Sequence, residues 1–153
     1  MGLFSFFKKK AFFSEQDQAR IVAAITSAEK STSGEIRLFV ESKNPYMDPL
    51  QRAAEIFFQS KMENTVDRNG VLLYIALKDR ELALFGDEGI HQKVGTQYWH
   101  SAVQNMIGQF SKHEIAAGIE QCILQVGQTL KDTFPYESST DKNELSDEII
   151  FGK

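Results

Sequence analysis

The sequence has little of several features that would identify an exported, membrane-spanning or nucleic-acid-binding protein. Its single cysteine, Cys122, excludes a disulfide within the chain and is typical of a reducing compartment. No apolar run reaches the roughly eighteen residues that a membrane-spanning helix needs. Positive charge is scarce, since 17 Lys and Arg residues stand against 21 Asp and Glu residues. The net charge of −4 argues against nucleic acid as a partner. From the single cysteine and the missing membrane span, we expect a cytoplasmic protein.

The common catalytic motifs are missing too. There is no glycine-rich phosphate loop, no zinc-ligand spacing, no Ser-His-Asp pattern and no Asp-x-Asp motif of phosphoryl transfer. Cys122 shares helical spacing with Ile119, Ile123 and Val126, which predicts a buried structural thiol rather than a nucleophile. The sequence therefore shows no catalytic nucleophile.

The length of 153 residues predicts one domain between two unusual ends. Residues 1–13 form an aromatic and basic arm, residues 14–136 the domain, and residues 137–153 an acidic tail. Residues 3–13 either cover the core or contact the inner face of a membrane peripherally, because phenylalanines beside lysines are typical of interfacial peptides. The tail is polar but ends in apolar residues, so it is either disordered or an arm packed in a groove.

The centre of the chain is the apolar run Val71–Leu77, bounded by Asn69-Gly70 and by charged residues. Such a short run predicts a strand buried on both faces, and the next apolar run, 82–85, is at hairpin spacing. Apolar periodicity predicts the other elements, which are helices near 15–30, 49–62, 90–94, 96–110 and 112–131 and a strand at 35–41. We therefore expect an α/β fold, a three-layer α/β/α sandwich whose small mixed sheet contains a βαβ crossover and a β-hairpin, with helices on both faces.

This topology predicts an acidic cluster at one end of the sheet. The crossover makes strands 35–41 and 71–77 parallel, and the hairpin returns the chain to where strand 71–77 began. The cluster then contains four carboxylates, those of Glu35, Asp67, Asp87 and Glu88. Asn69 belongs to it as well, and His91 lies one helical turn further on. Gathered carboxylates repel one another unless a cation relieves them, and oxygen donors on flexible loops favour Ca²⁺ over Mg²⁺. The alternative is a set of solvated charges at strand ends.

The opposite end of the sheet should carry Glu41 and the hairpin turn with Asp79, Arg80 and Glu81. Surface ion pairs are one interpretation of these charges, and a phosphate contact by Arg80 is another.

Three segments together resemble a known family. GEIRLFVES, then DRNGVLLYIALKDRELALFGDEGIH, then FP followed by NEL, are similar to the TPM domain family, which includes thylakoid-lumen acid phosphatases and photosystem II repair proteins. The resemblance is to the short bacterial form and covers about residues 15–136. It implies an α/β sandwich, and in some members an acidic, calcium-binding groove at the sheet end. Longer members have a signal peptide and a C-terminal membrane segment, and we expect neither here.

Three functions remain open at this stage. The first is a calcium-binding domain with an accessory or regulatory role in maintaining a membrane-associated protein complex. The second is a metal-assisted acid phosphatase acting on phosphomonoesters, in which Asp67, Asp87 and Glu88 hold an ion that polarises a phosphoryl oxygen. The third is an interaction module without a metal ion.

Overall fold

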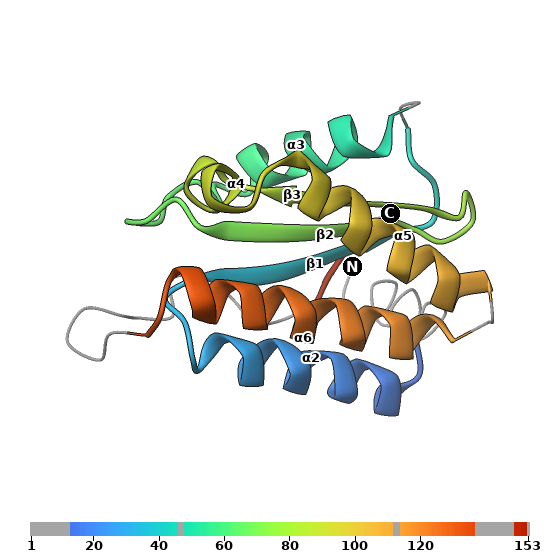
Figure 1. Cartoon of the computed structure of the whole chain (residues 1–153). Coiled ribbons are helices and arrows are strands. Elements are labelled where there is room, and N and C mark those ends of the chain that lie inside the picture. The colour runs from blue at the N-terminus through green and yellow to red at the C-terminus, as the bar shows by residue number, and fades with distance from the viewer. Residues whose placement is uncertain (1–12, 46–47, 112–113, 137–148, 153) are drawn as a thin grey trace.

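The computed structural model describes residues 13–45, 48–111, 114–136 and 149–152. The elements, in chain order, are α2 (Glu15–Glu29), β1 (Glu35–Glu41), α3 (Pro49–Gln59), β2 (Gly70–Ala76), β3 (Glu81–Gly86), α4 (Glu88–Val94), α5 (Thr96–Ser111), α6 (Ile115–Thr133) and β4 (Ile150–Phe151) (Figure 1). The N-terminal arm up to residue 12 and most of the acidic tail lie outside the described residues. No helix in the described ranges is long and apolar enough to cross a membrane.

The sheet has the strand order β3-β2-β1-β4. β1 and β2 are parallel with Glu35 opposite Gly70, and β2 and β3 are antiparallel with Val71 opposite Gly86. The predicted crossover and hairpin are therefore confirmed. The starts of β1 and β2 and the end of β3 lie at the same end of the sheet, on the left in Figure 1.

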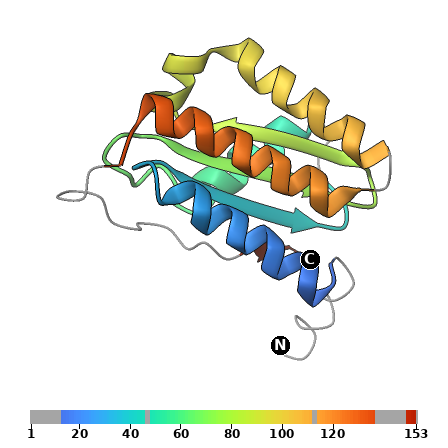
Figure 2. The ribbon, with the colours of Figure 1, turned by 60° about the horizontal axis from the view of Figure 1, so that its bottom comes forward.

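Helices cover both faces of the sheet, which confirms the predicted sandwich. α2 and α6 lie side by side across one face, and α5 packs beside α6 (Figure 2). α3 covers the other face over β2 and β3, where Phe57 and Tyr74 are fully buried. Strand residues alternate between these two cores, as a sheet buried on both sides requires.

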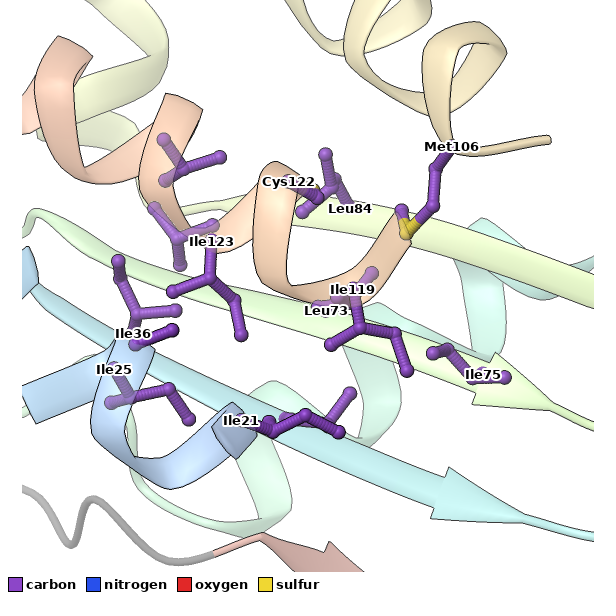
Figure 3. Close-up of a cluster of buried hydrophobic side chains, with 14 of the residues drawn as sticks. Ile21, Ile25, Ile36, Leu73, Ile75, Leu84, Met106, Ile119, Cys122 and Ile123 are labelled. Atoms are coloured by element: carbon purple, nitrogen blue, oxygen red, sulfur yellow. The ribbon is translucent and has the colours of Figure 1, made fainter. Parts of the chain in front are cut away.

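The larger core lies between the sheet and the helices α2, α5 and α6. Figure 3 shows Ile21 and Ile25 of α2 and Ile119 and Ile123 of α6 directed toward the strands. Cys122 is 3% exposed within this cluster, which confirms the prediction of a buried structural thiol.

Short polar side chains cap the N-termini of α2 and α3. The Ser14 hydroxyl accepts the Asp17 N–H at 3.0 Å, and the Asp48 carboxylate accepts the Leu50 N–H at 3.0 Å. Each bond satisfies a backbone donor that the first helical turn leaves without a partner. α3 ends at Gln59, earlier than the predicted end near residue 62, and Lys61 follows with a left-handed φ of 58°.

A short strand from the acidic tail completes the sheet. β4 runs parallel to β1 with Ile150 opposite Phe39, and the Gly152 N–H donates to the Val40 carbonyl at 2.6 Å. Ile149 is 8% exposed and belongs to the larger core. The end of the tail is thus an arm packed on the domain, one of the two alternatives that the sequence left open.

Candidate functional site

Backbone hydrogen bonds close the acidic end of the sheet. The Asp87 N–H donates to the Gly70 carbonyl at 2.9 Å, and the Gly89 N–H donates to the Arg68 carbonyl at 2.8 Å. These bonds join the start of β2 and the loop before it to the first turn of α4. The residues that hairpin geometry brings together are therefore neighbours, although about twenty positions separate them in the chain.

Asp87 is the most buried carboxylate of this junction. It is 2% exposed, and its Oδ1 accepts the Glu88 N–H at 2.8 Å. This cap explains why α4 begins at Glu88 rather than at the predicted residue 90. A carboxylate buried to this extent needs a positive partner or several donors to stay ionised.

Arg68 provides that positive partner. Its Nε lies 2.7 Å from Asp87 Oδ2 and its Nη2 lies 2.9 Å from Asp87 Oδ1, a bidentate pair. Its Nη1 also contacts Glu88 Oε1 at 3.1 Å. The hydrogen bond to Asp87 is the main cause that raises the pKa of Arg68, against the opposing effect of burial. Arg68 has a left-handed φ of 50°.

Asp67 belongs to a neighbouring chain of side-chain hydrogen bonds. The Ser33 hydroxyl donates to Asp67 Oδ2 at 3.1 Å, and the Asn69 amide donates to the same hydroxyl at 3.1 Å. Asp67 is exposed, while Asn69 is 1% exposed. Ser33 lies just before β1, so this chain connects the starts of both parallel strands.

Glu35, the fourth predicted member, has a different environment. It is 2% exposed on β1, two positions before Arg37, which is 9% exposed on the same strand. Burial lowers the pKa of Arg37, and the negative charges of Glu35 and Glu29 oppose that effect. The structure thus brings Asp87 and Glu88 together on Arg68, places Asp67 beside Ser33, and places Glu35 within the electrostatic range of Arg37.

Oxygen atoms dominate this end of the sheet, which is the donor set of a hard cation such as Ca²⁺. Their arrangement is an ion-pair network in which the Arg68 guanidinium stands between Asp87 and Glu88. Within the described ranges, no three His, Cys, Asp or Glu side chains form a ready metal cluster. A metal ion that uses Asp87 would therefore have to replace Arg68. His91, one turn further along, accepts the Trp99 indole N–H through Nδ1 at 3.0 Å.

Sequence reasoning did not assign a role to Arg68. The residue stands between Asp67 and Asn69, beside one of the four predicted carboxylates. The left-handed backbone conformation of Arg68 cannot be read from the sequence. The available signal was an arginine next to a predicted cluster of carboxylates, because such a residue can offset part of the cluster's charge without a metal ion.

A second buried polar network lies beneath α3, toward the opposite end of the sheet. Glu41 is 4% exposed, and Arg52 contacts its two carboxylate oxygens at 2.9 and 3.0 Å. The Tyr74 hydroxyl, on the adjacent strand, donates to the same carboxylate. Burial and the Glu41 charge raise the pKa of Tyr74, so its hydroxyl stays protonated. This network joins α3 to the sheet.

Comparison with known proteins agrees with this architecture. A family model described as the TPM domain matches residues 7–129. The NMR structure of the BA42 protein from the psychrophilic bacterium Bizionia argentinensis is 35% identical, with a TM-score of 0.84, over 92% of this chain and 96% of that one. A search of curated proteins gave no match.

A more distant structure shares the fold alone. The N-terminal domain of the cg2496 protein from Corynebacterium glutamicum is 17% identical, with a TM-score of 0.62, over 88% of this chain and 80% of that one. The family model covers the crossover, the hairpin and the acidic junction, which are the features that the sequence predicted. This chain therefore belongs to the TPM domain family.

Proposed function

We propose that this TPM domain binds calcium at the sheet end that contains Glu35, Asp67, Asp87 and Glu88. The observation that supports the proposal is the position of Arg68, whose guanidinium is the counter-charge of Asp87 and Glu88. With Asp67, this group carries more negative charge than one guanidinium offsets. Oxygen donors on loops suit Ca²⁺, whereas Mg²⁺ demands near-ideal octahedral geometry and gives up water reluctantly.

In this proposal Arg68 and the metal ion are alternatives. The Arg68 side chain is 36% exposed and can turn toward solvent, whereas the Asp87 side chain is 2% exposed and fixed as the cap of α4. Calcium would take the place of the guanidinium between Asp87 and Glu88. Asp67 and backbone carbonyl groups of the same loop would add further oxygen ligands.

The test is thermal unfolding with calcium, with magnesium and with EDTA. Free calcium at a hundred times its dissociation constant stabilises the folded state by about 2.7 kcal/mol. For a domain of this size, we expect the melting temperature to rise by about 5–10 °C. Magnesium should raise it less. An unchanged melting temperature in millimolar calcium would exclude the site.

Variants show whether calcium binds at this end. Asp67→Asn and Asp87→Asn should each shrink the calcium shift, because each removes a charged ligand. Arg68→Gln should enlarge the shift, because calcium no longer competes with the guanidinium. Asp79→Asn is the matched control, since Asp79 lies in the hairpin turn and accepts the Asn44 N–H at 2.7 Å. If only Asp79→Asn abolished the calcium shift, the ion would bind at the hairpin end of the sheet, and the proposed site would be wrong.

The cellular role that we propose is accessory or regulatory, in maintenance of a membrane-associated protein complex. It is supported by the family and by the aromatic and basic residues 3–13, which we propose contact the inner face of the membrane peripherally. Co-sedimentation with anionic liposomes, for the full chain and for Phe6→Ser/Phe7→Ser, tests that contact. Equal sedimentation of the two proteins would exclude it.

A metal-assisted acid phosphatase is the alternative function. Asp67, Asp87 and Glu88 would then hold an ion that polarises a phosphoryl oxygen. Arg80 is not available to help, because it lies in the β2–β3 turn at the other end of the sheet. We expect little turnover of a small phosphomonoester such as p-nitrophenyl phosphate. Metal-dependent turnover that Asp67→Asn abolishes in a folded protein would make the phosphatase the better proposal.

A further inference from the structure

The end of the sheet opposite the acidic residues carries a hollow. A cavity of about 460 Å³ opens between the β2–β3 turn, the C-terminal part of α5 and the start of α6. Its volume is within the range of pockets that bind small molecules. The lining is apolar apart from one cation, and it includes Leu77, Leu82, Ile107, Phe110, Ile115 and Arg80.

Arg80 does not pair with its neighbours in the hairpin turn, Asp79 and Glu81, because both carboxylates bind Asn44. Asp79 Oδ2 accepts the Asn44 N–H at 2.7 Å, and Glu81 Oε1 accepts the Asn44 amide at 2.9 Å. These two acidic side chains are therefore held toward the loop after β1. Arg80 has a left-handed φ of 54° and lines the cavity instead.

The Arg80 guanidinium has no hydrogen bond or ion pair with any residue that the structure describes. It is solvent-exposed beside an apolar wall, and Ile107 on that wall is 44% exposed. A ligand that satisfies both features has an apolar body, which would cover Ile107, and one anionic head. A guanidinium binds a carboxylate through two parallel hydrogen bonds, which an uncharged head cannot match.

We propose that this cavity binds an anionic amphiphile of the fatty-acid class, with the alkyl chain between α5 and the hairpin and the carboxylate on Arg80. This site is independent of the calcium proposal, because its residues lie at the other end of the sheet.

Dodecanoate below its micelle concentration is the probe, titrated into the full chain and followed by methyl NMR and calorimetry. We expect the methyl signals of Leu82, Ile107 and Ile115 to shift together and to saturate. Dodecanol, with the same chain and no charge, should bind about three- to tenfold more weakly, as expected for the loss of one partly exposed charge-assisted contact.

Three variants test the assignment. Arg80→Gln should weaken dodecanoate binding by the same factor and leave dodecanol binding unchanged. Ile107→Ser, on the exposed rim, should weaken both ligands. Lys78→Gln is the matched control, because Lys78 is an exposed cation of the same turn that does not line the cavity. It should bind both ligands like the wild type.

Several results would overturn the proposal. Methyl shifts that are absent or fall outside this cavity would do so, as would unchanged dodecanoate affinity in Arg80→Gln. Equal weakening by Lys78→Gln would show a general charge effect. If dodecanoate binds only after Phe6 and Phe7 are replaced by serine, the cavity holds the chain's own N-terminal segment, and the proposed ligand is wrong.

Discussion

Gly89→Ala tests the close approach on which the acidic junction depends. A Cβ on Gly89 would lie 2.1 Å from the Asp67 carbonyl oxygen and 2.7 Å from the Arg68 carbonyl oxygen, both backbone atoms. Overpacking of this kind costs about 1–3 kcal/mol. Stretching the hydrogen bond from the Gly89 N–H to the Arg68 carbonyl costs about 1 kcal/mol more. Alanine returns at most about 1 kcal/mol through its helix propensity.

The net expectation is a loss of about 1–3 kcal/mol in the free energy of unfolding. That corresponds to a fall of about 3–9 °C in melting temperature, measured by circular dichroism or calorimetry. The calcium shift should shrink as well, because Asp67 and the backbone carbonyl groups of its loop move away from Asp87.

Gly108→Ala is the matched control, the same exchange at an exposed position in the C-terminal part of α5. A Cβ there meets no described atom within 4 Å. Only the helix propensity changes, so we expect a gain of about 0.5–1 kcal/mol and a melting temperature about 2–3 °C higher. If Gly89→Ala raised the melting temperature as Gly108→Ala does, the approach of α4 to the loop before β2 would be refuted.

Other predictions concern the two cores and the edge of the sheet. Arg52→Met should cost about 2–4 kcal/mol in urea unfolding, because it leaves the Glu41 carboxylate buried without its counter-charge; a change below 1 kcal/mol would contradict this role. Burial raises the pKa of the Cys122 thiol to about 12 from 9.0. Cys122 should therefore resist DTNB at pH 8 until the protein unfolds, and folding stability should fall as pH rises above about 9, where only the unfolded thiol ionises. Rapid reaction of the folded protein would show an accessible thiol. Ile149→Asp should release β4 and speed hydrogen exchange of the Gly152 amide, whereas unchanged exchange would show that the strand is held in another way.

The elements near the centre of the chain could be predicted because local pattern and topology agree. The apolar run at 71–77 predicted a strand buried on both faces, and the observed β2, Gly70–Ala76, is shifted by one residue toward the N-terminus. The antiparallel return of β3 then placed Asp87 beside the start of β2, as the bond from the Asp87 N–H to the Gly70 carbonyl confirms. Strand polarity alone carries that information.

Side-chain directions at the same place could not be predicted. Hairpin geometry brings Arg68 as close to Asp87 as it brings Asp67. The guanidinium contacts Asp87 from a residue with a left-handed φ, a conformation that the sequence does not indicate. The pairing of β4 was hidden for another reason. Two apolar residues in a polar tail do not indicate which strand they pair with. The free edge of β1, to which β4 binds, forms only once the other strands have assembled into a sheet.

The attachment of β4 also has a consequence for folding kinetics. β1 and β4 lie far apart in the chain, at residues 35–41 and 150–151, and they pair through only two residues of each strand. Closing the long loop between them therefore costs chain entropy and forms few contacts. The strand should dock after the other three have paired, and it should detach before global unfolding. A fluorophore beside Gly152 would then report a fast opening that denaturant hardly accelerates, separate from the main unfolding phase.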